Sequence, residues 1–364
     1  MKKVFLYAYD RINLGDDLFI HTIVKRYPNV QFYLWTSKDN EQTFRILRNL
    51  KVIDHNSRFL KVLGKIRTSL PVRYKAGLEE KCDVVVYIGG SLFIEYDNWE
   101  NILNWWEYEA DNRSFYVIGA NFGPYKNEAY RERLNIIFGK MKDVCFRDKY
   151  SYQKFKTNKT VRSASDILFS YDMPAVNAVK KRIFISVINL LSKDEGSNKL
   201  SIYDEKYIDI MVQIIKEYLD EGYSIVLSSF CKYEGDEDAI EKILRSLDSN
   251  LKRDIQVLNY NGTNVDEILL SIAESEAVIA SRFHAIILGI LAGKPVYPIA
   301  YSDKTIHVLE DMNFQSEYVD IRNIDDFDFD KVRRYLNNVP VYPIKELRES
   351  AQKHFEKLDE VLKE

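Results

Sequence analysis

Short apolar runs alternate with longer amphipathic stretches along the first half of the chain. Runs with the length of buried strands lie at 3–8, 30–35, 82–88, 115–119 and 144–147. A helix is expected at 15–27, because Asp16 and Asp17 place negative charge in its first turn, and a further helix begins at Tyr150. Apolar strands separated by helices indicate a parallel sheet covered on both faces.

A second alternating block follows Asp172-Met173-Pro174. Its expected strands lie at 183–187, 223–228, 255–258, 277–280 and 296–300. Its expected helices lie at 203–221, 237–246, 266–274 and 285–292. The pattern predicts an α/β fold with two Rossmann-like doubly wound domains, residues 1–172 and 173–342, that face each other across a cleft. Residues 343–364 carry apolar positions along one side of a helix, so we expect an amphipathic C-terminal helix that packs back on a domain.

Length and charge narrow the classes of protein that fit this pattern. A chain of 364 residues exceeds one ordinary hydrophobic core, which agrees with two domains. A net charge of −3 argues against a nucleic-acid partner bound by general attraction. Three widely spaced cysteines, Cys82, Cys145 and Cys231, are typical of reduced thiols, and we see no signal peptide or membrane-spanning apolar run. A cytoplasmic protein is therefore expected.

Two segments stand outside the alternating pattern. Residues 54–80 are basic and weakly periodic, which favours a solvated loop or helix. The alternative is a mobile edge that meets an anionic acceptor or, as a peripheral protein, a membrane surface. Residues 92–108 hold three of the four tryptophans and are expected to form a loop, whose rings would either stack on a sugar or lipid-linked acceptor or pack against the neighbouring domain.

Charged side chains follow two expected strands at the point where a helix begins. Arg282 and His284 lie between the strand at 277–280 and the helix at 285–292, and Arg147 follows the strand at 144–146. Open α/β sheets bind ligands at this position, and guanidinium groups hold carboxylate and phosphate in bidentate fashion. The two arginines are thus candidates for a small polyanion, although an ordinary ion pair explains Arg147 equally well. Lys304 is a candidate for a third positive charge.

His284 is the first candidate for acid–base chemistry. A helix N-terminus disfavours its protonated form and a bound anion favours it, so the imidazole suits a proton donor that acts when an anion is present. His307, which also follows a strand end, competes for the role. No cluster of His, Cys, Asp or Glu has the spacing of a metal site, so we expect no metal.

Glycine-rich turns end three strands of the first sheet. They contain Asn13, Gly15 and Asp16, then Gly89, Gly90 and Ser91, and then Asn121 within residues 119–124. Glycine permits tight turns and leaves backbone amides open to a ligand, while Asn13 or Asp16 equally suits a helix cap. Asp166 ends the first half. Together the turns are expected to line one binding site.

These motifs resemble the polysaccharide pyruvyl transferase family. The matching pieces are NLGDD at 13–17, IGGS at 88–91, GANFGP at 119–124, FRDKYS at 146–151, SASD ending at Asp166, and SRFHAIILGILAGKP at 281–295 with YSDK at 301–304. Ser91 departs from the third glycine that family members often carry. The resemblance implies a glycosyltransferase-B-like arrangement, with the acceptor on residues 1–172 and the donor on residues 173–342.

The resemblance also implies the substrates. Phosphoenolpyruvate is the donor, no further cofactor is needed, and the acceptor is a saccharide of an exopolysaccharide or other cell-envelope polymer. Arg147 and Arg282 would bind the carboxylate and phosphate of phosphoenolpyruvate, His284 would act as general acid, and Asp16 or Asp166 would orient an acceptor hydroxyl. The acceptor sugar, its attachment to a lipid and the oligomeric state are not specified by these residues.

Two other functions fit the same pattern. A glycosyltransferase with this layout would use a nucleotide-sugar donor, with Glu267 or Glu274 on the ribose. A non-catalytic sugar- or nucleotide-binding subunit of an envelope assembly would keep ligand binding without needing His284.

Overall fold

The computed structural model describes residues 1–194, 199–312, 314, 318–338 and 341–363, and it divides into two compact units. The first unit comprises Met1–Arg11, Asp16–Ser170 and Glu346–Glu364, and the second comprises Ile12–Gly15 and Tyr171–Lys345. The main boundary thus follows Ser170, two residues before the expected one. The assignment of residues 12–15 to the second unit was not expected. Among the described residues, no helix has the length and apolar character needed to cross a bilayer.

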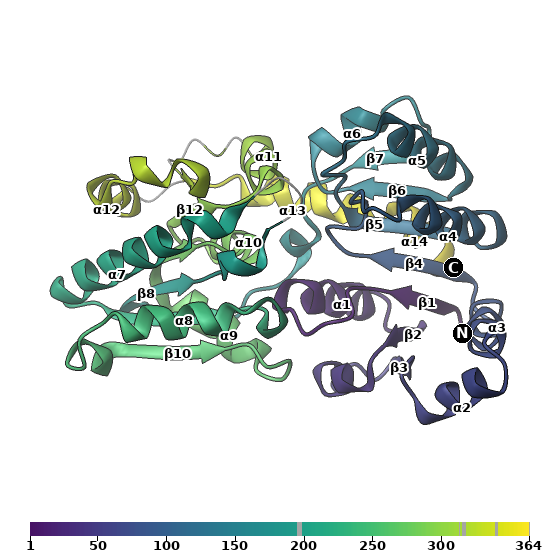
Figure 1. Cartoon of the computed structure of the whole chain (residues 1–364), viewed down its shortest axis with the longest axis horizontal. Coiled ribbons are helices and arrows are strands. Elements are labelled where there is room, and N and C mark those ends of the chain that lie inside the picture. Colours follow the sequence, from purple (N-terminus) through teal and green to yellow (C-terminus); the bar gives the residue numbers. More distant parts are fainter. Residues whose placement is uncertain (195–198, 313, 315–317, 339–340, 364) are drawn as a thin grey trace. The chain divides into compact units, whose positions relative to one another are not determined.

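The first unit is built on a seven-stranded sheet in the order β3-β2-β1-β4-β5-β6-β7 (Figure 1). Every neighbouring pair is parallel. Its strands are β1 (Lys3–Tyr7), β2 (Gln31–Thr36), β3 (Leu50–Asp54), β4 (Val84–Ile88), β5 (Phe115–Ala120), β6 (Asp143–Phe146) and β7 (Val161–Ser163). The sequence pattern did not predict the two edge strands β3 and β7, because neither is a continuous apolar run.

Helices cover both faces of this sheet. They are α1 (Leu14–Arg26), α2 (Arg58–Ile66), α3 (Ser69–Glu79), α4 (Trp99–Asn112), α5 (Glu128–Lys140) and α6 (Lys149–Phe155), with 3₁₀ turns η1 (Lys38–Phe44) and η2 (Ile167–Ser170). One core is strongly aromatic, and within it Phe93 packs against Trp106, Phe138 and Phe146. Asp148 caps α6 by accepting from the amide of Ser151 at 2.6 Å.

The expectation of a loop at 92–108 is wrong over most of that range, because residues 99–112 form α4. Trp106 is buried and stacks on Tyr87 with ring centroids 5.2 Å apart. Trp99 packs edge-on against Tyr130 at 5.7 Å. An amphipathic helix can bury its tryptophans in the core, so packing within the first unit accounts for them.

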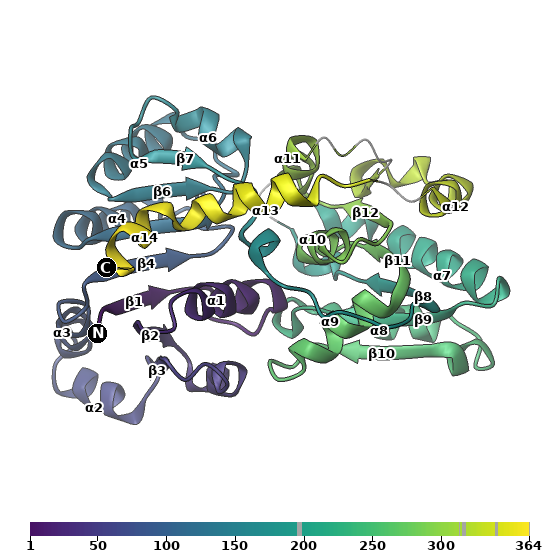
Figure 2. The same cartoon turned by 180° about the vertical axis from the view of Figure 1, so that it is seen from behind.

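The C-terminal residues return to the first unit (Figure 2). The expected single helix is divided into α13 (Ile344–Gln352), the 3₁₀ turn η8 (Lys353–Phe355) and α14 (Glu356–Leu362); Glu364 lies outside the described residues. Arg26, the last residue of α1, and Tyr27, which follows it, donate to the carboxylate of Asp359 in α14. His354 is fully buried and lies 2.8 Å from the carbonyl oxygen of Ser165. These contacts attach the tail beside the segment that carries Asp166.

The second unit has a six-stranded parallel sheet in the order β10-β9-β8-β11-β12-β13. Its strands are β8 (Lys180–Ser186), β9 (Ser224–Ser229), β10 (Ile255–Asn259), β11 (Ser275–Ala280), β12 (Val296–Ala300) and β13 (Val319–Asp320). Its α-helices are α7 (Asp204–Asp220), α8 (Asp236–Arg245), α9 (Val265–Glu274), α10 (Phe283–Leu291), α11 (Asp303–Asp311) and α12 (Phe329–Asn337). Its 3₁₀ turns are η3 (Leu190–Ser192), η4 (Leu200–Tyr203), η5 (Lys232–Glu234), η6 (Leu251–Asp254) and η7 (Ile321–Asp326).

Both sheets have the strand order of a Rossmann fold. The order reverses between β1 and β4 in the first unit and between β8 and β11 in the second. Loops that leave the carboxyl ends of two such strands run to opposite sides of the sheet, and they leave a crevice in which open α/β proteins bind ligands. The expected fold class, two Rossmann-like α/β domains, is confirmed for each unit by its strand order. The expected placement of the two units across a cleft stays a prediction.

Candidate functional site

Arg282 lies at the reversal point of the second sheet. It follows the end of β11 and occupies the cap position of α10, with an extended backbone at φ −80° and ψ 128°. Its amide donates to the hydroxyl of Ser186 at the end of β8, at 3.2 Å, and the amide of Ser281 donates to the Ser186 carbonyl at 3.1 Å. The two central strands therefore fix the backbone from which Arg282 projects.

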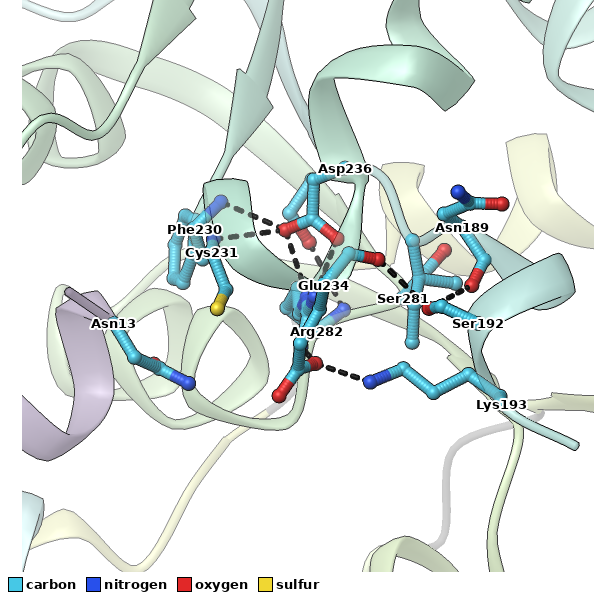
Figure 3. Close-up of polar contacts among 12 residues, drawn as sticks. Asn13, Asn189, Ser192, Lys193, Phe230, Cys231, Glu234, Asp236, Ser281 and Arg282 are labelled. Carbon is cyan, nitrogen blue, oxygen red and sulfur yellow. Dashed lines mark hydrogen bonds and ion pairs between the residues drawn. The ribbon is translucent and has the colours of Figure 1, made fainter. Parts of the chain in front are cut away.

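The Arg282 side chain is held by two carboxylates (Figure 3). Nε donates to Oδ2 of Asp236 at 2.9 Å, and the terminal nitrogens form ion pairs with Asp236 and Glu234. Arg282 is 6% exposed and Asp236 is fully buried. Burial opposes the charge on Arg282, but Asp236 and Glu234 outweigh it and raise the pKa of the guanidinium well above its ordinary value.

Asp236 also organises the turn between β9 and α8. It is the first residue of α8, and its Oδ2 accepts the backbone amides of Phe230 and Cys231, each at 3.0 Å. A carboxylate at a helix N-terminus suits the helix dipole, and here it additionally accepts two backbone amides and two guanidinium N–H groups from two other segments. Asp236 thus links the end of β9 to the start of α10.

Glu234 and Asp236 flank Gly235 in the turn that leads into α8, and both pair with Arg282. Gly235, between the two acidic residues, has a left-handed φ of 77°, which favours glycine. Lys193 pairs with Oε2 of Glu234, the same oxygen that accepts from Nη1 of Arg282 (Figure 3). Burial would raise the pKa of Glu234, but Arg282 and Lys193 lower it to about 2, so the carboxylate is ionised at neutral pH.

His284 is the second residue of α10 and is partly exposed. The backbone of Gly15 packs directly on its imidazole, because a Cβ built on Gly15 would overlap the ring at Nδ1. The segment that carries Gly15 is tied to the same turn as Asp236, since the amide of Leu14 donates to the carbonyl of Phe230 at 3.1 Å. Asn13 accepts from the Gly15 amide at 3.1 Å. The second unit therefore brings together Asn13, Gly15, Arg282 and His284.

Arg147 forms a separate group in the first unit. It follows β6, and its amide donates to the carbonyl of Ala120 at the end of β5 at 2.9 Å. Nη1 donates to Oδ2 of Asp166 at 3.0 Å, and Nη2 donates to Oδ1 of Asn121 at 2.9 Å. The guanidinium reaches back to the end of β4, where a Cβ on Gly90 would lie 2.6 Å from Nη2. The first unit thus brings together Gly90, Asn121, Arg147 and Asp166.

Asp166 is fully buried beside Arg147. It accepts the amide of Leu168 at 2.9 Å in addition to the guanidinium. Burial raises the pKa of Asp166, against the pull of Arg147 and the hydrogen bond from Leu168. The first unit therefore pairs its arginine with a carboxylate whose neutral form is favoured by its surroundings.

The arginines do not present open guanidinium groups, as a simple anion receptor would. Each is buried against carboxylates of its own unit, because a buried charge needs a counter-charge when no ligand supplies one. Direct anion binding by Arg147 and Arg282 stays a prediction. The glycine rationale also changes: neither Gly15 nor Gly90 has a positive φ, and both serve close packing on a site side chain.

The remaining predicted residues lie at helix starts and strand ends. Asp16 is in the first turn of α1, and Lys304 is the second residue of α11; both are partly exposed. Gly89 is buried and Ser91 is exposed after β4. His307 lies on α11, in its second turn, and is partly buried. Over the described ranges, no three His, Cys, Asp or Glu side chains are grouped as a metal site would require.

The acidic partners of Arg282, Asp236 and Glu234, were not predicted from the sequence, and neither was Lys193. A signal was available: GDED at 235–238 follows the expected strand at 223–228, in the same strand-to-helix position as Arg282. The strand-end argument applied to Arg147 and Arg282 would therefore also have found Asp236.

Comparison with known proteins identifies a family and a fold. The model of the family described as polysaccharide pyruvyl transferase matches residues 13–303, which include the predicted site residues except Lys304. The amylovoran biosynthesis protein AmsJ of Erwinia amylovora is 22% identical over 271 residues, which are 67% of this chain and 63% of that protein. The match thus spans less than two thirds of the relative's length.

Solved structures support the fold. The UDP-GlcNAc 2-epimerase of Methanocaldococcus jannaschii, in complex with UDP-GlcNAc and UDP, has a TM-score of 0.63 at 12% identity, covering 99% of this chain and all of that one. MnaA of S. aureus, solved with UDP, has a TM-score of 0.62 at 13% identity, covering 100% and 97%. At such identities the likeness concerns the fold alone, and it agrees with the expected glycosyltransferase-B-like class.

Proposed function

Because the chain belongs to the polysaccharide pyruvyl transferase family, we propose that it transfers a pyruvyl group from phosphoenolpyruvate to hydroxyls of a sugar. The sugar belongs to a cell-surface polysaccharide or its precursor, and the product is a pyruvate ketal. The observation that carries the proposal is the family match, which runs through the site groups of both units. The relative named for amylovoran biosynthesis supports an exopolysaccharide role.

The proposed reaction makes two carbon–oxygen bonds and breaks one. A proton is delivered to the methylene carbon of phosphoenolpyruvate, which becomes a methyl group and leaves an oxocarbenium-like centre. One sugar hydroxyl attacks that centre, phosphate departs, and a second hydroxyl of the same sugar closes the ketal. Of the two hydroxyl protons released, one restores the acid and the other leaves with phosphate.

His284 is the proposed proton donor. It is a titratable group on the first turn of a helix beside the reversal point of the sheet, and Gly15 fixes one side of its ring. General acid catalysis by a positioned side chain contributes about 10²- to 10⁴-fold in rate. Because Gly15 restricts where the ring can lie, the chain favours one orientation of the donor.

The arginines have unequal proposed roles. Arg147 pairs with Asp166, whose pKa is raised by burial, so we propose that a bound anion can replace Asp166 as the counter-charge. Arg282 is held by two carboxylates, and we assign it mainly to ordering the α10 turn that carries His284. Lys304 and the backbone at Gly89 and Ser91 remain proposed contacts to substrate, and Asp16 a proposed contact to the acceptor hydroxyl.

The proposed compartment is the cytoplasm, at the inner face of the membrane. Its support is the state of the cysteines: Cys82, Cys145 and Cys231 are all free thiols. Burial raises the pKa of Cys231 to about 12, so this thiol is neutral and unreactive at physiological pH. The acceptor is proposed to be a saccharide carried on a lipid.

An assay for ketal formation tests the proposal. The purified protein is incubated with phosphoenolpyruvate and a panel of glycans, and phosphate release and the ketal methyl signal in proton NMR are followed together. His284→Gln is expected to lose about 10²-fold or more in turnover while phosphoenolpyruvate binding persists. His307→Gln is the matched control, because it removes the competing imidazole from the neighbouring helix α11.

Two outcomes would overturn the assignment. Equal loss in His307→Gln and none in His284→Gln would move the acid role to His307. Consumption of a nucleotide sugar with no phosphate release from phosphoenolpyruvate would favour the glycosyltransferase alternative. That alternative is tested because the two solved structures of similar fold contain UDP.

A further inference from the structure

Helices α2 and α3 form a small helical hairpin on the first unit (Figure 1). Phe59 of α2 meets Tyr74 of α3 edge-on, with ring centroids 5.5 Å apart. Farther along, α2 approaches α3 closely, because a Cβ on Gly64 would lie 3.6 Å from the ring of Pro71. The side chain of Ser57 caps α2 by accepting the amide of Leu60. These contacts hold the hairpin as a defined surface element rather than a solvated loop.

The hairpin exposes large apolar side chains. The exposed fractions are 57% for Phe59, 56% for Val62, 71% for Ile66, 64% for Val72 and 37% for Tyr74. In α2 the exposed residues are spaced three and four apart, so they share one face, while Leu60 is buried on another. A helix on the surface of a monomer ordinarily turns polar residues outward, so this apolar face is expected to meet a partner.

The same hairpin concentrates positive charge. The sequence from His55 to Leu78 contains no Asp or Glu. Its exposed basic residues are Arg58, Lys61, Lys65, Arg67 and Arg73. Lys75 instead turns inward and donates to the hydroxyl of Tyr7 at 2.6 Å. Within the described part of the chain, the ion pairs found include none of the five exposed cations. The hairpin is therefore strongly basic in a chain whose net charge is −3.

We propose that the α2–α3 hairpin docks on an anionic lipid surface. The five cations suit the phosphates of acidic lipids, and Phe59, Val62 and Ile66 suit the boundary between headgroups and acyl chains. Three partners could cover this surface: an anionic membrane, a second copy of this chain, or a nucleic acid. The charge and the apolar face of the hairpin favour the membrane. A second copy of this chain would bring the same positive charges against each other across a two-fold axis, and a nucleic acid would leave the apolar face uncovered.

This proposal is independent of the reaction. It requires only the surface of the first unit, so binding can be measured without substrate or turnover. If the proposed function also holds, the hairpin brings the enzyme to the surface where a lipid-carried sugar is presented.

Vesicle sedimentation provides the test. The full-length protein is mixed with vesicles of phosphatidylcholine alone, or of phosphatidylcholine with phosphatidylglycerol. We expect partitioning to be about tenfold or more greater on the anionic vesicles and to fall as salt is raised, because each surface cation interacts with the negative potential of the bilayer. Equal binding to both kinds of vesicle, or none to either, would overturn the proposal.

Two sets of variants locate the surface. The apolar set is Phe59→Ser, Val62→Ser and Ile66→Ser, and its control replaces exposed residues elsewhere, namely Ile136→Ser, Val179→Ser and Ile202→Ser. The charge set is Lys61→Glu, Lys65→Glu and Arg67→Glu, and its control makes the same change in charge at Lys156, Lys159 and Arg253. Each hairpin set is expected to reduce binding to anionic vesicles about tenfold or more, and each control set to leave it within about twofold.

The same variants distinguish membrane binding from self-association of the chain. All substituted side chains are exposed, so the far-ultraviolet circular dichroism should match the parent protein. If either control set lowers vesicle binding as much as its hairpin set, the surface is misassigned. If sedimentation velocity without lipid shows a dimer that the hairpin sets dissociate, the surface is a self-association site and the membrane proposal is wrong.

Discussion

Arg282 and Arg147 are both buried guanidinium groups that need counter-charges, and the two units supply these charges with different partners. Arg282 lies at the reversal point of its sheet and is held by two carboxylates, one of which also bonds Lys193. Arg147 lies beyond β6, away from the reversal point between β1 and β4, and it donates to Asp166 and to the side-chain amide oxygen of Asn121. Both are buried strand-end arginines, and at Arg282 two carboxylates, Asp236 and Glu234, pair with one guanidinium.

This difference suggests that Arg282 is a structural anchor, held permanently by its carboxylates, whereas Arg147 is a receptor that can exchange its carboxylate for a ligand's anion. At Arg282, the low pKa of Glu234 and the raised pKa of the guanidinium mean that both of these groups keep their charges through the physiological range. At Arg147, burial raises the pKa of Asp166, so exchanging that carboxylate for a ligand's anion costs less. A strand-end arginine is thus not by itself evidence of a ligand contact; its partners decide what it can release.

Breaking the Arg282 anchor should have the largest effect. Arg282→Ala leaves the fully buried Asp236 without its cation, so we expect the second unit to lose about 3 to 5 kcal/mol of unfolding free energy. All four tryptophans, Trp35, Trp99, Trp105 and Trp106, lie in the first unit. Urea unfolding monitored by circular dichroism should therefore show a new transition at low urea concentration. Tryptophan fluorescence, excited at 295 nm, should not report this transition.

Arg147→Ala is the matched variant for that comparison. Asp166 keeps the amide of Leu168, and burial raises its pKa, so we expect a smaller loss of about 2 kcal/mol, which should appear in the tryptophan signal. Equal losses in both variants would contradict the distinction between anchor and receptor. In the double variant Arg282→Met with Asp236→Asn, the buried charges are removed while the side-chain oxygen can still accept the amides of Phe230 and Cys231, so part of the lost stability should return.

The glycine contacts offer a second way to compare the sites. Gly15→Ala forces the His284 ring out of position, and we expect turnover to fall about 10²-fold, as for a general acid displaced by about 1 Å. Gly90→Ala meets only the end of the flexible Arg147 side chain and should cost less. Gly77→Ala, where a Cβ has no neighbour within 4 Å, is the control and should leave turnover unchanged. Activity in Gly15→Ala equal to the control would exclude the packed geometry.

The two units should also respond differently to acid. Burial, together with the charges of Arg162 and Arg147, lowers the pKa of His354 to about 3, against the opposing effect of the hydrogen bond to Ser165. An unfolded histidine titrates near 6.5, so the unfolded state binds more protons and the first unit loses stability as the pH falls from about 6.5 toward 3. The loss attributable to His354 at pH 5 is about 2 kcal/mol relative to pH 7.

Tryptophan-detected urea unfolding at both pH values checks this expectation. His354→Gln keeps a donor for the carbonyl of Ser165 but cannot titrate, so its loss between pH 7 and pH 5 should be about 2 kcal/mol smaller than in the parent protein. In the second unit, the lowered pKa of Glu234 gives stability that is lost only below about pH 4.5, toward 2. An identical loss in His354→Gln and the parent would exclude His354 as the cause.

The smallest expected effect concerns ligand affinity. Glu234→Gln removes one negative charge beside Arg282 while Asp236 still anchors the guanidinium, so phosphoenolpyruvate should bind about two- to fivefold more tightly if its anion approaches this unit. Glu241→Gln makes the same change at an exposed position of α8 and is the control. Unchanged affinity in Glu234→Gln, measured by calorimetry, would confine the anion contact to Arg147.

The sequence predicted the architecture well because buried parallel strands are continuous apolar runs. The positions of Arg147, Arg282 and His284 followed from the strand-end rule, and the structure places each at the end of a strand or the start of a helix. Edge strands such as β3 escaped detection because they are only partly buried. Asp236, Lys193 and the contact between Gly15 and His284 join segments far apart in the chain, and no local pattern specifies such pairings.

Thermal unfolding with saturating phosphoenolpyruvate, compared with UDP, CMP and GDP, tests most directly whether phosphoenolpyruvate is the pyruvyl donor. A ligand at about 100 times its dissociation constant stabilises the folded state by about 2.7 kcal/mol, which is readily measured. The account predicts stabilisation by phosphoenolpyruvate alone, reduced in Arg147→Ala and retained in His284→Gln. Stabilisation by a nucleotide but not by phosphoenolpyruvate would contradict it.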